Sequence, residues 1–389
     1  MQMEKYKLGD IATVEISGVD KKMKDGEKEI RLCNFVDVYY NWAITTARYD
    51  SFMFASANPN EISKFQLKKG QVALTKDSET RDDIGIPTYN ADDFDDVILG
   101  YHCALITPNK AFLDGRYLNA LLHTDYAKKY FACNASGSGQ RYALSVEALN
   151  SFPVPIIPLR EQKRIGEIFS ALDKKIELNR QINQNLEAMA KQLYDYWFVQ
   201  FDFPDENRRP YKSSGGKMVW NDKLKREIPE GWDDGILIDI ANITMGQSPD
   251  GSSYNEVGEG MLFYQGSTDF GMRFPSVRQY TTAPSRFAKK GDILMSVRAP
   301  VGSINIANND CCIGRGLSAI NSKLGSISHL YYILNDLRIA FDQRNAAGTT
   351  FGSITKEDLY SLPIIIPSDE VIRAFDKICS PMFDRQMIL

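Results

Sequence analysis

The sequence lacks long apolar runs and lacks an excess of basic charge, and each absence excludes a class of protein. No stretch approaches the roughly 20 apolar residues of a membrane helix, and residues 1–8 contain no signal-like apolar segment. Lysine and arginine number 46 against 50 for aspartate and glutamate, whereas many DNA-binding proteins are basic overall. We therefore expect a soluble, cytoplasmic protein in which any contact with DNA uses local basic surfaces or a partner that contacts phosphate.

Cysteine and histidine are too scattered for a disulfide framework or a metal site. The six cysteines form no Cys-x-x-Cys pair, and we expect them to be buried thiols of a reducing compartment. The three histidines are His102, His123 and His329, which argues against a zinc site. The cysteines are Cys33, Cys103, Cys133, Cys311, Cys312 and Cys379.

The familiar catalytic motifs are also missing. There is no phosphate-binding loop of the Gly-x-x-x-x-Gly-Lys-Ser/Thr type, no His-Glu-x-x-His and no Gly-x-Ser-x-Gly. The Asn/Asp-Pro-Pro-aromatic motif that positions an amino group for methylation is absent too. Asp82 and Asp83 could form a catalytic pair, but solvated loop charges explain them better. We predict that the chain is not an enzyme and binds no cofactor or metal.

Three sequence blocks recur in the same order and divide the chain into two repeats. Residues 68–75 (KKGQVALT) match residues 289–296 (KKGDILMS), and residues 149–158 (LNSFPVPIIP) match residues 359–367 (LYSLPIIIP). A loop of small residues lies between these blocks, at 135–141 (ASGSGQR) and at 346–352 (AAGTTFG). A period of roughly 200 residues is too long for a solenoid and indicates two copies of a whole domain.

A long helix is predicted between the two copies. From Glu161 to Val199 there is no proline, and Gly166 is the single glycine. Apolar residues recur at heptad spacing for about five heptads, which favours a coiled coil about 57 Å long. Lys175 and Asn179 interrupt this seam, and an Asn there can fix register. The alternative is an amphipathic helix lying on a globular core.

The predicted fold class is α+β, with two similar mixed α/β domains separated by long antiparallel coiled-coil helices, of which the second is short. Residues 1–158, the first repeat, and residues 231–367, the second repeat, form the two globular domains. Residues 159–199 form the first spacer helix, residues 200–230 a polar linker or docked loop, and residues 368–389 the second spacer helix.

Basic and polar side chains beside glycines are the remaining candidates for function. Glycine allows a backbone to approach a groove wall closely, and Gln and Arg can make bidentate hydrogen bonds to adenine and guanine edges. The competing explanation is that the glycines serve turns and the arginines make surface ion pairs. The candidate DNA contacts are Lys76, Arg81, Ser138, Gln140 and Arg141 in the first repeat and Arg298, Arg315, Thr349 and Thr350 in the second.

Two segments carry a likeness to a known family. Residues 158–165 (PLREQKRI) lead from the first repeat into the helix, and residues 197–204 (WFVQFDFP) lead out of it. With a second variable domain following, the chain resembles the specificity subunits of type I restriction–modification systems over nearly its whole length. The resemblance implies a non-catalytic subunit with two target-recognition domains, each of which reads half of a split DNA sequence.

The resemblance also implies partners and interface residues. The two long helices pack antiparallel and dock two methylation subunits, which hold S-adenosylmethionine, and restriction subunits add ATP- and Mg-dependent translocation and cleavage. The implied helix and subunit interface comprises Ile165, Ile168, Leu172, Ile176, Ile182, Leu186, Met189, Leu193, Trp197, Phe375, Ile378 and Met382.

The second spacer helix is expected to cover only part of the first. Pro381 interrupts its helical pattern, and we expect it to run back over Leu186, Met189 and Leu193. Residues 161–179 would then lack a helical partner, so the chain would self-associate there or need another protein. Alternatively, the first repeat folds over this stripe.

Two other functions stay open at this point. The chain could be an assembly protein whose helix organises partners while its globular repeats bind protein. It could also be a cryptic nuclease or methyltransferase, against which the missing motifs argue. Sequence-specific DNA binding would separate the first possibility from the specificity subunit, and binding of S-adenosylmethionine would support the second.

Overall fold

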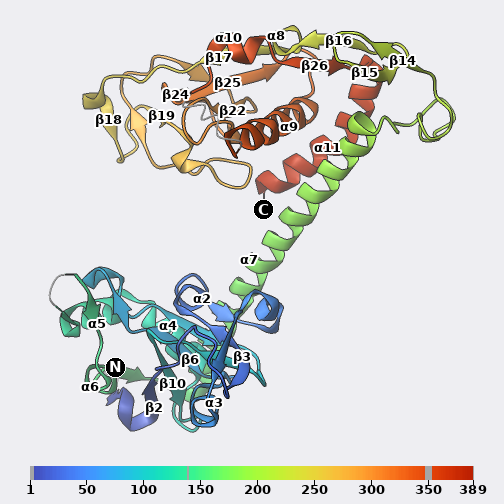
Figure 1. The fold of residues 1–389 in the computed structure, drawn as a ribbon. Coiled ribbons are helices and arrows are strands. Elements are labelled where there is room, and N and C mark those ends of the chain that lie inside the picture. The colour runs from blue at the N-terminus through green and yellow to red at the C-terminus, as the bar shows by residue number, and fades with distance from the viewer. Residues whose placement is uncertain (1–3, 138–139, 347–352, 389) are drawn as a thin grey trace. The chain divides into compact units, whose positions relative to one another are not determined.

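The computed structural model describes residues 4–137, 140–346 and 353–388, with the backbone alone for 339–346. The chain divides into two compact units, Met1–Leu178 and Asn179–Leu389 (Figure 1). Both units mix helices and strands, and the helix α7 (Leu159–Tyr194) contributes its two halves to different units.

The first unit is built around a five-stranded sheet in the order β2-β10-β6-β8-β4. Neighbouring strands in this sheet are antiparallel, except that β4 and β8 are parallel. A second sheet, in the order β5-β3-β9, covers one face, and two small sheets, β1-β13 and β11-β12-β7, complete the unit. The strands are β1 (Glu4–Lys7), β2 (Ala12–Ile16), β3 (Lys28–Cys33), β4 (Ala43–Ile44), β5 (Met53–Ala57), β6 (Val72–Thr75), β7 (Asp77–Ser78), β8 (Pro87–Asn90), β9 (Val97–Leu99), β10 (Cys103–Pro108), β11 (Ser136–Gly137), β12 (Tyr142–Ala143) and β13 (Pro153–Ile156).

Both faces of the central sheet are buried, because successive side chains of a strand point to opposite faces. Val72 and Leu74 of β6 pack in a core that includes Leu118 and Phe131 from the helices. Ala73, between them, packs in a separate core with the β5-β3-β9 sheet. The helices are α1 (Leu8–Ile11), α2 (Phe35–Tyr39), α3 (Pro59–Phe65), α4 (Gly115–Leu122), α5 (Asp125–Asn134) and α6 (Val146–Asn150).

The second unit repeats this plan. A four-stranded sheet, β17-β25-β22-β23, lies beside a five-stranded sheet, β18-β20-β19-β24-β21, and two two-stranded sheets, β14-β15 and β16-β26, complete it. The strands are β14 (Met218–Asn221), β15 (Arg226–Pro229), β16 (Asp233–Ile236), β17 (Ala241–Met245), β18 (Tyr254–Asn255), β19 (Met261–Tyr264), β20 (Tyr280–Thr281), β21 (Phe287–Ala288), β22 (Ile293–Ser296), β23 (Ile304–Ile306), β24 (Cys311–Ile313), β25 (Leu317–Ser322) and β26 (Pro363–Ile366). The helices are α8 (Leu237–Ile240), α9 (Ile327–Ala346), α10 (Lys356–Tyr360) and α11 (Asp369–Ile388).

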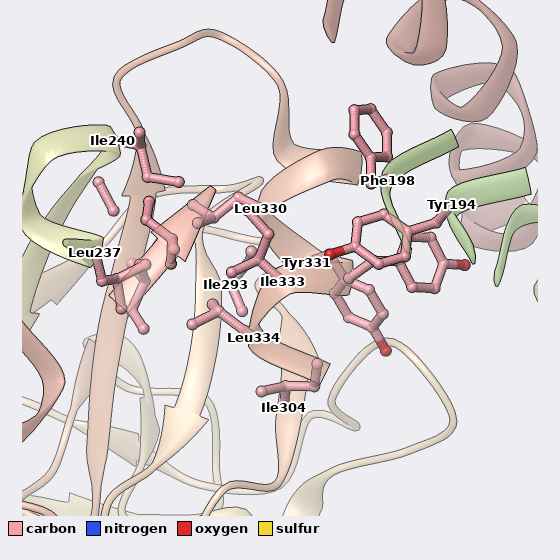
Figure 2. Close-up of a cluster of buried hydrophobic side chains, with 14 of the residues drawn as sticks. Tyr194, Phe198, Leu237, Ile240, Ile293, Ile304, Leu330, Tyr331, Ile333 and Leu334 are labelled. Atoms are coloured by element: carbon pink, nitrogen blue, oxygen red, sulfur yellow. The ribbon is translucent and has the colours of Figure 1, made fainter. Parts of the chain in front are cut away.

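The main core of the second unit joins its sheet to its helices. Figure 2 shows Ile293 and Ile304 from the sheet facing Leu330, Ile333 and Leu334 of α9. Tyr194 and Phe198, from the end of α7 and the turn after it, enter the same cluster. The aromatic exit segment of the first spacer helix is therefore part of the core of this unit.

The two sequence repeats share an equivalent set of backbone hydrogen bonds. Lys76 N donates to His102 O over 2.9 Å, and Val297 N donates to Gly316 O over 2.9 Å. Leu144 N donates to Lys76 O over 2.8 Å, and Ile354 N donates to Val297 O over 2.9 Å. Position by position, β6 therefore corresponds to β22 and β10 to β25, and residues 144 and 354 follow equivalent loops.

The start of α7 is fixed to the first unit by a buried glutamine. The Gln162 side chain accepts from Asp114 N over 2.9 Å and donates to the carbonyls of Phe112 and Ile157, both at 2.9 Å. Gly166, one turn further on, lies so close to α4 that an added Cβ would sit 2.5 Å from Arg116 Cβ. These contacts explain why the helix entry requires Gln and Gly.

The second half of α7 packs antiparallel to α11 within the second unit. Phe375, near the start of α11, meets Phe198 with ring centroids 5.0 Å apart, and Gln386, near its end, donates to Asn183 O over 3.0 Å. The antiparallel helix pair is thus confirmed. Pro381 does not interrupt α11; that expectation is wrong, since Cys379 and Phe383 on either side are buried and hold the helix together.

Candidate nucleic-acid interface

The first repeat contains a cavity of about 750 Å³ near the end of β6. Its walls come from residues 19–21, the segment from the end of β3 through α2, residues 77–83, the turn before β10 and the segment before β12. Gln140 and Arg141, two of the predicted DNA contacts, line this cavity. No local sequence pattern indicates the cavity, because its walls come from five separate segments.

Lys76, Asp77, His102 and Arg141 form a charged group that we call the Asp77 cluster. Asp77 Oδ2 accepts from Lys76 Nζ over 2.9 Å and lies 2.5 Å from His102 Nδ1. Arg141 Nη2 lies 3.7 Å from the same oxygen and 2.6 Å from His102 Nδ1. Arg141, carried by the loop before β12, is therefore held against the end of β6.

The Asp77 carboxylate stays ionised within this cluster. Burial alone would raise the pKa of Asp77, but the hydrogen bonds from Lys76 and His102 outweigh it and hold the pKa below its usual value. The Arg141 side chain remains 56% exposed. One edge of its guanidinium is thus fixed by the protein, while the rest is available to a ligand in the cavity.

Aromatic side chains form another wall of the cavity. Phe35 and Tyr39 stack with ring centroids 5.6 Å apart, and Tyr39 Oη donates to Asp83 over 2.7 Å. This hydrogen bond, with burial, raises the pKa of Tyr39 to about 12. Tyr40 and Tyr101 are exposed beside it. Asp83 is therefore a structural acceptor rather than a solvated loop charge.

The charges around the cavity are mixed rather than basic. The carboxylates of Asp20, Asp77, Glu79 and Asp83 stand beside Lys21 and Arg141. Such a surface suits hydrogen bonding to base edges better than attraction of phosphate. The acidic run at 92–96 has other roles: Asp92 accepts from Thr46 N over 2.8 Å, and Asp96 accepts from Tyr49 Oη over 2.7 Å.

The remaining candidates of the first repeat lie close to this cavity or outside the described residues. Lys76 donates a hydrogen bond to Asp77, and the Arg81 guanidinium lies 5.0 Å from the centroid of the Tyr142 ring. Ser138 falls outside the described residues, as do Thr349 and Thr350 of the second repeat. Asp77, His102 and Tyr101 were missed by the sequence analysis, although Asp77 directly follows the repeated block at 68–75.

In the second repeat, Arg298 and Arg315 lie at the ends of adjacent strands. Arg298 comes two residues after β22 and pairs with Ser353 across an isolated bridge. Arg315 comes two residues before β25, and its backbone N donates to Ser248 Oγ over 3.2 Å. Both side chains are exposed. The structure brings these two candidates together, since Val297 N bonds to Gly316 O between them.

The predicted helix interface divides into a covered part and an exposed part. Ile168, Leu172 and Ile176, which we call the α7 stripe, are 54%, 52% and 51% exposed, whereas Ile165 packs against the first core. Leu193, Trp197, Phe375 and Met382 pack in the core of the second unit, and Ile182 and Leu186 are half-buried. Met189 and Ile378 are exposed, so the predicted register is wrong at these two positions.

The register differs because aromatic residues, rather than the heptad seam, decide how α7 meets α11. A π-helical turn, Asp195–Val199, ends the spacer helix, and its Trp197 and Phe198 meet Phe375 with ring centroids 5.9 and 5.0 Å apart. On α11 the buried face comprises Ile372, Phe375, Cys379, Phe383 and Gln386. Of the six cysteines, Cys133 is exposed, which corrects the expectation that all are buried.

Two features are absent from the residues that the structure describes. No group of three or more His, Cys, Asp or Glu side chains in that part of the chain could hold a metal ion. None of its helices is long and apolar enough to cross a membrane.

The chain has two equivalent α/β repeats with polar strand ends, joined to a long helix. This is the architecture of a binding protein with two similar domains. The chain belongs to the family of type I restriction modification DNA specificity domains, which matches residues 2–188 and residues 229–377. The two matched ranges confirm the internal repeat and the resemblance to specificity subunits.

Similar proteins carry the same description. The putative type I restriction enzyme MjaX specificity subunit of Methanocaldococcus jannaschii is 33% identical over 328 residues, covering 82% of this chain and 72% of that protein. The type I restriction enzyme HindI specificity subunit of Haemophilus influenzae is 25% identical over 390 residues, covering 84% and 83%. These relatives are specificity subunits, the non-catalytic components of such systems, which confirms that the chain is not an enzyme of its own.

A solved structure shares the fold. The crystal structure of the type I restriction–modification system S subunit from M. genitalium matches with a TM-score of 0.61 and 13% sequence identity, over 99% of this chain and 90% of that chain. At this identity the likeness shows the fold alone. It agrees with the predicted α+β architecture of two domains and long helices.

Proposed function

We propose that this chain reads a bipartite DNA target, one half with residues 1–158 and the other with residues 231–367. The observation that carries the proposal is one frame of backbone hydrogen bonds, which recurs at the end of β6 and the start of β10 and again at the end of β22 and the start of β25. Residues 159–199 and 368–389 act as spacer helices, and residues 200–230 link the spacer to the second repeat.

Base edges, rather than phosphates, are the natural ligands of the first repeat. Its cavity combines Gln140 and Arg141 with carboxylate acceptors, and such a set can complement donor and acceptor patterns in the major groove. Because the chain carries 46 basic against 50 acidic residues, partner subunits supply much of the phosphate contact. Binding by the isolated chain is therefore weak, and binding within a complex is strong.

The spacer helices dock two methylation subunits, and restriction subunits join the complex. S-adenosylmethionine, ATP and Mg belong to these partners, and this chain binds no cofactor. The complex acts in the cytoplasm. The α7 stripe supports the docking proposal, since three half-exposed aliphatic side chains on one helix face favour association with a protein. Without a partner, residues 161–179 pair with a second copy of the chain.

Mapping of methylated bases tests this function. The chain is co-expressed with a methylation subunit, and methylated positions are read across the genome. We expect one split motif. Exchange of residues 1–158 for those of a relative should change one half of the motif and leave the other half intact. Two halves that change together would contradict the two-reader proposal, and methylation without any motif would favour an assembly protein.

A further inference from the structure

The two repeats carry opposite charges at one equivalent position. Asp77 follows β6 by two residues and pairs with Ala143, and Arg298 follows β22 by two residues and pairs with Ser353. The flanking hydrogen bonds, from Leu144 N to Lys76 O and from Ile354 N to Val297 O, are the same in both repeats. The first repeat thus places a carboxylate where the second places a guanidinium.

A second equivalent position lies beside the first. Gly100 N donates to Cys33 O over 2.8 Å, and Gly314 N donates to Tyr264 O over 2.8 Å. The residue after each glycine is Tyr101 in the first repeat and Arg315 in the second. At these two adjacent positions the first repeat therefore has Asp and Tyr, whereas the second has two arginines.

The surroundings of these side chains differ accordingly. In the first repeat, Asp77 engages Lys76 and His102 and restrains Arg141. In the second repeat, Arg298 and Arg315 are exposed, and neither lies within ion-pairing distance of a carboxylate in the part of the chain that the structure describes. Arginines that are not neutralised keep their paired N–H donors available for a ligand.

We infer that Arg298 and Arg315 are the specificity-determining residues of the second repeat and that they read guanine, whereas the first repeat does not read guanine through the equivalent positions. The planar guanidinium donates two parallel hydrogen bonds to guanine O6 and N7, a pattern that no other base edge offers in the major groove. Asp77 and Tyr101 provide no such pair of donors. The inference rests on the proposed reading of DNA and adds the chemical class of one half-site.

The test separates the effect of the positive charge of the two arginines from the effect of their planar guanidinium geometry. Arg298→Ala, Arg298→Lys, Arg315→Ala and Arg315→Lys are each assembled with the methylation subunit, and methylated motifs are mapped. Lysine keeps the charge but loses the planar fork. We expect discrimination at a G·C pair of the half-site governed by residues 231–367 to fall about 10- to 100-fold in both the alanine and the lysine variants. The other half-site should not change.

A matched control is Arg209→Ala, which removes an exposed arginine of the segment 200–230 that pairs with Asp205 at 3.3 Å. It should leave both half-sites unchanged. Lysine variants with unaltered specificity would overturn the inference, since they would mark the arginines as phosphate contacts. A second half-site without a discriminated G·C pair would overturn it as well. If methylation follows no motif at all, the proposed function fails instead, and thermal unfolding of each variant separates both results from a loss of folding.

Discussion

Asp77 Oδ2 and His102 Nδ1 lie 2.5 Å apart at the end of the central sheet of the first repeat, and through this contact one buried carboxylate organises three basic side chains. His102 adopts a positive φ of 76°, a conformation that costs a non-glycine residue about 1 kcal/mol or more. The interaction with Asp77 offsets that cost. The position of Arg141 in the cavity therefore depends on a residue that does not itself protrude into solvent.

The first prediction concerns Asp77→Asn. Because the folded-state pKa of Asp77 is lowered, its contribution to stability is present above the unfolded pKa, about 3.9, and is lost as pH falls through the folded value. At pH 7 the variant should lose about 1–3 kcal/mol, and the difference from the wild type should shrink below pH 4. Urea unfolding at several pH values measures this. Asp82→Asn, an exposed neighbour, should change little.

The second prediction concerns the buried His329 of the second unit. Burial lowers the pKa of His329 to about 3. Between this value and pH 6.5, the unfolded chain therefore binds a proton at His329 and the folded chain does not. Stability should therefore decrease as pH falls below about 6.5, by about 2 kcal/mol between pH 6.5 and pH 5. His329→Phe, which keeps the ring beside Phe198, should remove this slope. Hydrogen exchange of the α9 amides at the two pH values measures it; an unchanged slope in the variant would assign the effect elsewhere.

The third prediction concerns Gly166→Ala at the start of α7. Alanine favours helix by about 1 kcal/mol over glycine, but its Cβ would lie 2.5 Å from Arg116 Cβ and 3.2 Å from Asp114 Oδ1. We expect a net loss of about 1–3 kcal/mol in the first unit, since overpacking forces α7 away from α4. Lys174→Ala, at an exposed position of the same helix, is the control. A Gly166→Ala variant that is as stable as the wild type would show that the helices can separate freely.

The sequence anticipated what depends on periodicity and repetition. The heptad pattern placed a helix at 161–199, and the helix begins at Leu159 with a π-helical end at Val199. The likeness of residues 68–75 to 289–296 predicted two copies of a domain, and both blocks become equivalent strands. Gly166 and the segment at 158–165 were noticed, but the hydrogen bonds of Gln162 became visible only once α4 lay beside the helix.

What depends on long-range contacts could not be anticipated. The Asp77 cluster joins residues 76–77, 102 and 141, and no local pattern relates these positions. The face of α11 was predicted one residue out of register at Ile378, because Phe375 packs on Tyr194, Trp197 and Phe198 rather than on a heptad seam. Aromatic side chains from distant segments decided the packing, and their partners are not encoded by spacing along one helix.

The last prediction concerns the α7 stripe. Complete burial of an aliphatic side chain is worth about 1.5–3 kcal/mol, and Ile168, Leu172 and Ile176 are each about half exposed. Covering all three would therefore stabilise a complex by about 2–4 kcal/mol in total. Light scattering across a concentration series should show self-association of the purified chain, and Ile168→Glu/Leu172→Glu should weaken it about 30-fold or more.

The control for the stripe keeps its aliphatic face and reverses charge elsewhere on the helix. Lys163→Glu/Lys174→Glu alters two exposed positions of α7 and should retain self-association. A methylation subunit that occupies the stripe should compete with the second copy, so its addition should convert the self-associated chain into a mixed complex. A wild-type chain that remains monomeric at high concentration with no partner bound would refute the prediction, because the exposed aliphatic face would then be tolerated in water.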